Sequence, residues 1–477
     1  MFKHDAFYWI NRMDKASTVA ALKQGFIDES AAKDIAQAIA ELTESELRPT
    51  DYIDIQPMLL KRVGHIGSMI HVGRSRQDIL ATLHRLFLRD RFIYVYFLSL
   101  KTRKLLLKLA ERNIDTVLPS YTNGVQAQPV TLAHLLLGYE ATIARSAKRL
   151  KEFFPRLNKS PLGSAALATS SFSIDRILLA ELLGFHGIVE NAFDAAQLAV
   201  IDVGAEAANI AALLALSVGT LVQDLHIQFH HVRPWLLLDD EALKSPSTLM
   251  PQKRNPVALN RTRLLASEVI GDAVKATMAA HNVNSGLTDY KRENAAETLE
   301  RACRMLNELN AVLGGIRVDK EAALDQVNAD YSVTSELAGA LQRKLGIPFK
   351  VTHEFSSRLV NYGREHRLKP AELPFTEAVR IFKLVSQEMN GVESELELTE
   401  EAFFSLLDPN RMINSYVGVG GSHPVEVERL IKRAQEWVQE DDVWHLNLQR
   451  NLEESAARLD ELFSEVVKGE EESSFWL

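Results

Sequence analysis

Several features that mark other classes of protein are scarce in this sequence or missing from it. There is one cysteine, Cys303, which excludes an intramolecular disulfide and fits a reducing compartment such as the cytoplasm. The net charge of −9 argues against a general nucleic-acid-binding protein, because no basic tract offsets it. No nucleotide-binding glycine loop is present, so the sequence gives no reason to expect a cofactor.

Long apolar runs are also missing. The longest extends from about Ile210 to Val222, which is too short to span a bilayer and predicts a buried helix. Residues 1–17 hold no apolar stretch of the kind found in signal peptides, so we expect no secretory leader and no membrane partner. Strand signals are nearly absent, whereas helical spacing of apolar residues is clear in Ala31–Leu47. We therefore predict an all-α protein.

A chain of 477 residues allows about three domains. We expect an N-terminal helical domain at 1–95, a central bundle of long helices at 96–350 and a smaller helical domain at 351–477. Within them, long helices are predicted at about 79–112, 129–154, 205–231 and 255–282. The third of these helices is so apolar that a large bundle or a tight oligomer must cover it on all sides.

The most informative stretch extends from Ser247 to Asn260. Pro256 suits the first turn of a helix, and Asn255 before it is a good N-cap residue. Lys253 and Asn255 then stand where a helix begins, a place that favours anions such as a carboxylate. Ser247 lies on the loop that could fold over such a ligand. The alternative is a capped surface helix with a solvated Lys–Arg pair.

Two other polar groups of residues were weighed as sites. The run His71–Asp78 places a glycine beside two arginines and a serine, which predicts an anion-binding turn. His226 and His230 are four residues apart and so share a helix face. No Glu-x-x-His pattern or cysteine cluster accompanies them, so we favour histidines that stabilise a helix C-terminus and predict no metal site.

Three segments resemble known family motifs. Residues 246–256 resemble the signature loop of the fumarase/aspartase superfamily, Gly-Ser-Ser-x-Met-Pro-x-Lys-x-Asn-Pro, with Pro246 and Thr248 as departures. His71–Asp78 resembles the His-Thr-Gly-Arg-Ser-Arg-Asn-Asp motif of argininosuccinate lyases. Residues 121–132 are similar to Tyr-Thr-His-Leu-Gln-x-Ala-Gln-Pro-Val-Thr-Leu of the same lyases. The resemblance covers about residues 50–430.

The resemblance implies a fold of three helical domains and a homotetramer whose active sites each gather segments from three subunits. It also implies a carbon–nitrogen lyase reaction, in which an N-substituted aspartate or similar succinyl compound loses an amine and becomes fumarate, or the reverse addition. The small-molecule partner would be a dicarboxylate. The implied catalytic residues are Ser247 as the base and Lys253 and Asn255 as the carboxylate cradle. The implied substrate-binding residues are Arg74, Ser75, Arg76, Gln77, Thr122, Asn123, Gln128 and Tyr290.

Two departures affect the acid of this reaction. Asn123 stands where the family has its proton-transferring histidine, and Asn260 stands where the family has the glutamate that pairs with it. A carboxamide cannot move protons near pH 7 as an imidazole does. Ala295 and Thr298 also stand where argininosuccinate lyases carry a glutamine and a lysine that recognise the substrate. The loss of these polar partners would weaken the binding of argininosuccinate.

Three hypotheses follow from these matches and departures. The chain is a lyase with a different substrate, in which another group, such as His71 or Tyr290, supplies the proton. Alternatively, it is an argininosuccinate lyase with weakened activity, or a non-catalytic tetramer that binds a dicarboxylate or acts as a scaffold. The retained Ser247, Lys253 and Asn255 favour catalysis, whereas Pro246 stiffens a loop that must close and favours the last hypothesis.

Overall fold

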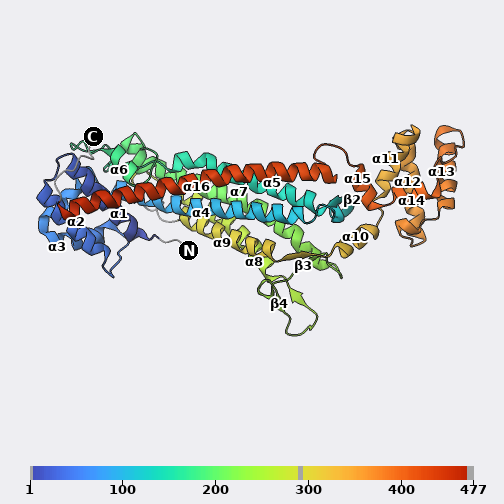
Figure 1. The fold of residues 1–477 in the computed structure, drawn as a ribbon, viewed down its shortest axis with the longest axis horizontal. Helices are drawn as coiled ribbons and strands as arrows, with labels where there is room; N and C mark the ends of the chain where they lie inside the picture. Colours follow the sequence, from blue (N-terminus) through green and yellow to red (C-terminus); the bar gives the residue numbers. More distant parts are fainter. Residues whose placement is uncertain (1–3, 288–293, 470–477) are drawn as a thin grey trace.

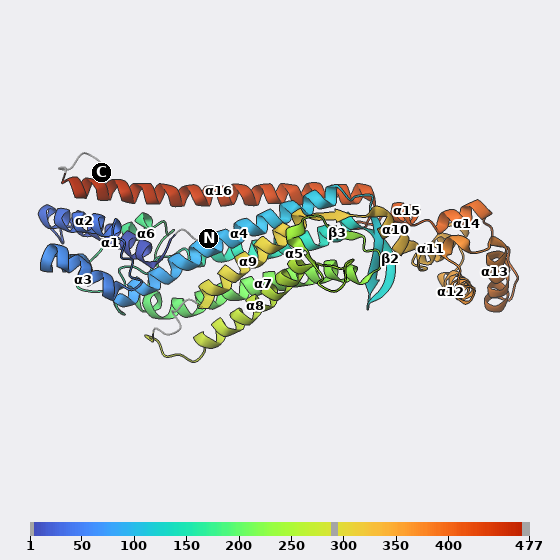
Figure 2. The ribbon, with the colours of Figure 1, turned by 90° about the horizontal axis from the view of Figure 1, so that it is seen from below.

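The computed structural model describes residues 4–287 and 294–469. The molecule is an elongated bundle of long helices with a smaller helical unit at each end (Figures 1 and 2). The α-helices are α1 Ala6–Lys23, α2 Glu29–Thr43, α3 Tyr52–Val63, α4 Arg76–Glu111, α5 Leu132–Leu157, α6 Arg176–Leu182, α7 Ala199–Ile227, α8 Val257–Ala280, α9 Asn294–Gly314, α10 Lys320–Asn328, α11 Thr334–Leu345, α12 Phe349–Glu365, α13 Phe375–Asn390, α14 Glu400–Leu406, α15 Pro409–Ser415 and α16 Pro424–Lys468. The predicted all-α class is confirmed.

Short strands and short helical turns connect these helices. The strands pair antiparallel as β1 with β2, β3 with β6 and β4 with β5. Their bounds are β1 Val117–Thr122, β2 Val125–Thr131, β3 Leu236–Leu238, β4 Ser245–Pro246, β5 Arg254–Asn255 and β6 Ile316–Val318. The turns are η1 Gly64–His71, η2 Asp194–Leu198, η3 Gln228–His230, η4 Glu241–Leu243 and η6 Pro370–Glu372.

The central core is formed by α4, α5, α7, α8 and α9. Helix α7 has almost no polar face, and residues Asp194–His230 are long and apolar enough, by length and composition alone, to cross a membrane. However, 56% of its most apolar window is buried inside the bundle. The helix is therefore a core element of this fold, as its composition predicts.

Residues 351–477, predicted as one domain, contribute to two separate cores. Helices α11 to α14 form a compact unit around Phe355, Phe382 and Phe403. Helix α16 instead runs back along α4 and reaches α1, α2 and α6, where Leu459 and Phe463 join the core of the N-terminal unit. Its 45 residues make this possible, because they extend about 67 Å at the usual helical rise.

The chain after Pro119 folds differently from the prediction. Pro129 does not open a helix but lies in β2, opposite Pro119 of β1. Asn123 and Gly124 have φ values of 53° and 75°, and these positive angles are what a tight two-residue hairpin turn requires. Helix α5 begins only at Leu132, where the Thr131 side chain accepts a hydrogen bond from the backbone N–H of His134 at 3.3 Å.

The predicted N-cap at Asn255 is also wrong. Helix α8 begins at Val257, Pro256 occupies the cap position, and no side chain caps this end. Asn255 lies in β5, and its side-chain amide donates to the carbonyl of Ser245 in β4 at 3.3 Å. The amide is therefore used to close the base of the loop between β4 and β5 instead of the helix end.

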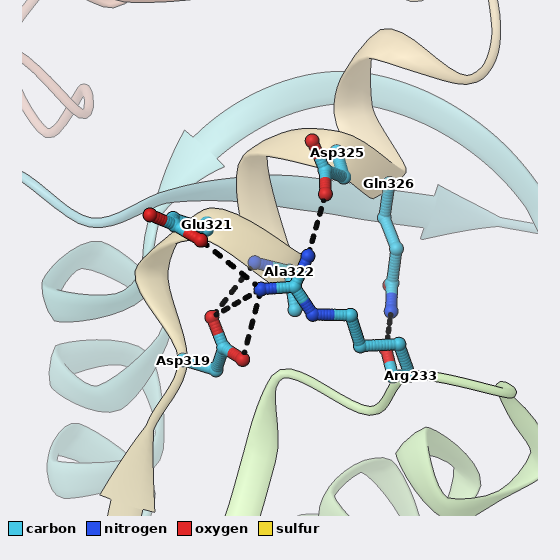
Figure 3. Close-up of polar contacts among 6 residues, drawn as sticks. All are labelled: Arg233, Asp319, Glu321, Ala322, Asp325 and Gln326. Carbon is cyan, nitrogen blue, oxygen red and sulfur yellow. Dashed lines mark hydrogen bonds and ion pairs between the residues drawn. The ribbon is translucent and has the colours of Figure 1, made fainter.

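The connection that leads from α7 toward this loop is fixed by one guanidinium. Arg233 contacts three carboxylates of the β6–α10 region, Asp319, Glu321 and Asp325, at 2.9–3.3 Å (Figure 3). The side chain of Gln326 donates to the backbone carbonyl of Arg233 at 3.2 Å. The pairing of β3 with β6 begins at Leu236, three residues after Arg233. These contacts hold the segment that follows α7 against β6 and α10.

A buried ion pair ties three long helices together. The guanidinium of Arg103 on α4 contacts Glu140 of α5 at 2.6 Å and Asp441 of α16 at 2.7 Å. The side chains of Arg103 and Glu140 are only 1% and 3% exposed. Removal of one partner would leave a buried charge without compensation.

We expect Arg103→Met to destabilise the protein by about 3–5 kcal/mol, because Glu140 would then be buried without its counter-ion. Urea unfolding, followed by circular dichroism, measures this loss. The matched control is Lys104→Met, which removes an exposed pair with Asp442 and should cost at most about 1 kcal/mol. Equal effects of the two substitutions would contradict the role given to the buried pair.

Candidate active site

The Arg74–Gln77 segment opens helix α4. The hydroxyl of Ser75 accepts from the backbone N–H of Gln77 at 3.0 Å, and Ser75 and Asp78 together form a capping box. Arg76 is exposed and forms a bidentate ion pair with Asp51, which holds the pKa of that carboxyl below its usual range. The Gln77 amide donates to the backbone carbonyl of Gly286 at 3.3 Å. The segment thus presents Arg76 at the surface and ties Gln77 to the segment that follows α8.

Arg74 of the same segment faces inward. Its side chain is fully buried and contacts Asp14 of α1 at 2.7 Å, with the Tyr52 ring 5.1 Å from the guanidinium. The Tyr52 hydroxyl in turn lies 3.3 Å from Nδ1 of His71. Burial, followed by the charge of Arg74, lowers the pKa of His71 below its usual value. This geometry favours a role for Arg74 in holding the segment rather than in touching a ligand.

Asp78 lies beneath the segment and is completely buried. It accepts hydrogen bonds from the backbone N–H groups of Ser75 at 2.7 Å and Gly163 at 2.8 Å. Burial raises the pKa of Asp78 to about 7, against the opposing effect of these hydrogen bonds and of Arg74. A carboxyl that titrates near neutrality therefore links the start of α4 to the 160–168 connection.

The β1–β2 hairpin exposes the second set of predicted residues. Thr122, Asn123 and Gln128 are all exposed. The backbone carbonyl of Gln128 accepts from the Ser120 hydroxyl at 2.6 Å, so the amide side chain is not needed to hold the strand. The tip of the hairpin is thus an exposed polar projection.

The Ser247–Asn255 loop carries the third set. The Ser247 hydroxyl oxygen accepts from the backbone N–H groups of Met250 at 3.0 Å and Leu249 at 3.3 Å. Lys253 is exposed, and its backbone N–H donates to the Met250 carbonyl at 3.0 Å. Leu249 is 83% exposed, which is unusual for a leucine and leaves an apolar surface on the loop.

The three sets lie apart in a single chain. Helix α4 has 36 residues and is about 54 Å long, and it separates the Arg74–Gln77 segment from the hairpin. The start of α4 lies beside α3 at one end of the bundle, β2 lies near α15 toward the other end, and the β4–β5 loop projects from the side (Figures 1 and 2). Tyr290 falls outside the described residues.

Comparison with known proteins identifies the family of the chain. Residues 12–271 match the family model described as lyase, and residues 331–414 match the model of the argininosuccinate lyase C-terminal region. The chain is an argininosuccinate lyase-like member of the fumarase/aspartase superfamily. It is 31% identical to the argininosuccinate lyase of Archaeoglobus fulgidus, over 88% of this chain and 85% of that one. The enzyme of Methanoculleus marisnigri is 32% identical, over 92% and 90%.

The fold of this lyase-like chain is also found among solved structures. EDDS lyase in complex with formate superposes with a TM-score of 0.88, at 23% identity, over 97% of this chain and 92% of that one. At this identity the likeness shows the fold alone. The predicted superfamily fold is therefore confirmed.

Sequence reasoning missed the residues that support the lyase segment at the start of α4. Asp14, Asp51 and Tyr52 come from the N-terminal unit and contact Arg74 or Arg76. No local pattern marks them, because each is paired through the tertiary fold. Asp78 could have been found, since a serine followed three residues later by an acidic residue is the pattern of a capping box.

The raised pKa of Asp78 predicts a pH-dependent stability. Its folded pKa of about 7 lies above its ordinary value of 3.8, so its contribution is fully present below pH 3.8 and is lost as pH rises through 7. Wild-type stability should therefore fall relative to that of Asp78→Asn between pH 4 and pH 8, by up to about 4 kcal/mol. Urea titrations of both proteins across this range test it, and parallel curves would contradict a raised pKa.

Proposed function

We propose that this chain is a carbon–nitrogen lyase that eliminates an amine from an N-substituted aspartate, or from a similar succinyl compound, to give fumarate, or catalyses the reverse addition. The observation that supports this most is the Ser247–Asn255 loop, in which a serine hydroxyl, a lysine and an amide are held close together in sequence on a short hairpin. The relatives described above carry names of the same reaction class.

Ser247 is the proposed base. A serine hydroxyl is a weak base at its ordinary pKa and must be activated. Two backbone N–H groups, of Leu249 and Met250, already point at the Ser247 oxygen at 3.0–3.3 Å. Hydrogen bonds of this kind stabilise the alkoxide more than the neutral hydroxyl and so favour loss of its proton. When the loop closes and excludes water, this stabilisation increases.

The two carboxylates of the substrate need separate partners. Lys253 and Asn255 are proposed to hold the carboxylate whose charge grows as the Cβ proton leaves. Ser75, Arg76, Gln77, Thr122, Asn123 and Gln128 are proposed to bind the other carboxylate and the amine half, with Tyr290 added from outside the described residues. Arg74 holds its segment in place through Asp14.

A homotetramer is proposed because one chain keeps these segments apart. The outer faces of α7 and α8 expose large apolar side chains, among them Leu216 at 54%, Val274 at 59% and Met278 at 66%. An apolar surface of this kind on two adjacent helices favours contact with further copies. Neighbouring copies can then bring the start of one α4 and the hairpin of another to the loop of a third. The single cysteine, Cys303, leaves the chain without an intramolecular disulfide, which favours a reducing compartment such as the cytoplasm.

The elimination is tested with purified protein and a panel of N-substituted aspartates that includes argininosuccinate, with fumarate as the readout. We expect at least one compound to give fumarate, and Ser247→Ala to lower kcat by at least about 100-fold because the base is lost. Ser267→Ala, which removes an exposed hydroxyl on α8, should leave the rate unchanged. Undiminished turnover by Ser247→Ala would exclude Ser247 as the base, and no fumarate from any compound would contradict the elimination.

Shared sites predict complementation between inactive variants. Arg76→Gln and Ser247→Ala should each inactivate the enzyme, but the two changes fall on segments that come from different copies at each site. Co-expression in equal amounts should therefore restore about a quarter of the wild-type sites, if the copies mix at random. A mixture as inactive as its components would show that both segments come from one chain.

A further inference from the structure

The proposed elimination requires a proton for the departing nitrogen, and the Ser247–Asn255 loop does not provide an obvious source. Ser247 accepts a proton, and Lys253 and Asn255 are engaged with a carboxylate. Asn123 and Asn260 carry neutral amides that do not exchange protons near pH 7. An imidazole close to the loop would fill this role.

Such an imidazole lies directly beside Asn260. His226 is in the last turn of α7, and Asn260 is in the first turn of α8, five residues after Asn255. The side chains of His226 and Asn260 are hydrogen-bonded to each other. His226 is half-buried and Asn260 is exposed, so a small molecule can reach the pair. The imidazole therefore stands at the foot of the helix that the Ser247–Asn255 loop leads into.

The surroundings of His226 fix its ring. His230 is one helical turn further on, with its ring perpendicular to that of His226 and 6.2 Å away. The ring of Phe229 is 6.4 Å away on another side. Beyond His230, the contacts of Arg233 with the β6–α10 region anchor the chain (Figure 3). These neighbouring rings restrict the orientations that the imidazole of His226 can adopt.

The surroundings of His226 lower the pKa of its ring. Burial lowers the pKa of His226, as do the charges of His230 on η3 and Arg263 on α8, whereas the hydrogen bond with Asn260 raises it. The net pKa lies below the ordinary 6.5, so the imidazolium form of His226 gives up its proton more readily than an unperturbed imidazolium does.

We infer that His226, with Asn260 orienting its ring, is the residue that donates the proton to the departing nitrogen; this rests on the elimination proposed above. The Ser247 alkoxide takes the Cβ proton, the C–H electron pair becomes the C=C bond, and the C–N pair leaves with the nitrogen. That nitrogen receives the proton of the His226 imidazolium. One proton leaves carbon and one joins nitrogen, so fumarate and an amine result, and exchange with solvent restores both side chains.

The test is His226→Gln, assayed on the compound that gives fumarate with the wild-type enzyme. We expect kcat to fall by at least about 100-fold while KM changes by less than about threefold, because the substrate carboxylates are held elsewhere. The wild-type kcat should decline as pH rises through the pKa of His226, since the imidazolium is lost, and the variant should lack this decline. His231→Gln, an exposed histidine on the same connection, is the control and should retain wild-type kcat. Circular dichroism and gel filtration verify that the variants keep the fold and assembly.

The outcomes separate the two proposals. If the wild type forms fumarate, Ser247→Ala does not, and His226→Gln keeps the wild-type kcat, only the role of His226 is overturned. That role is also overturned if the variant loses activity through KM alone or retains the wild-type pH dependence. If the wild-type enzyme forms no fumarate from any compound, the elimination fails and the role of His226 fails with it.

Discussion

The rigid length of α4 is the constraint on which the rest of this molecule depends. It begins at the Arg74–Gln77 segment and ends shortly before the β1–β2 hairpin, about 54 Å away. Tertiary contacts hold both ends, so no hinge within one chain can bring the two segments together. A site that needs both must therefore be built between chains, and the exposed apolar faces of α7 and α8 are the surfaces that could assemble them.

Charges buried around α4 determine how firmly its ends are placed. Near the start, Arg74 contacts Asp14, and Asp78 accepts hydrogen bonds from the backbone N–H groups of Ser75 and Gly163. Near the other end, Arg103 joins α4 to α5 and α16. Ion pairs of this kind add little net stability compared with apolar packing, but they penalise any shift of register that would leave a charge unpaired. The Arg74–Gln77 segment and the β1–β2 hairpin are therefore held in place at the two ends of α4.

The sequence predicted correctly those features that depend on residues close together in the chain. The burial of α7 and the presence of a long helix after the His71–Asp78 run follow from the composition and spacing of residues that are close in sequence. Pro129 was misassigned because the Asn123–Gly124 turn, which returns the chain to pair with β1, overrides the preference of proline for a helix start. Asn255 closes a hairpin with Ser245, ten residues earlier, and so is not free to cap α8. Arg74 and Asp14 are 60 residues apart in sequence, so no local pattern predicts that they form an ion pair.

The proposed positions of the base and the acid also change the role expected of the β1–β2 hairpin. If His226 donates the proton, then Ser247, the carboxylate cradle and the acid all belong to one chain, around the entry to α8. The neighbouring copies would contribute the start of α4 and the exposed Thr122–Asn123 tip, which bind and orient but transfer no proton. A hairpin freed from acid–base chemistry needs only to complement the amine half of the substrate, by shape and hydrogen bonds. The neutral amide of Asn123 suits that requirement, so the loss of a titratable group there is compatible with a working lyase of altered substrate range.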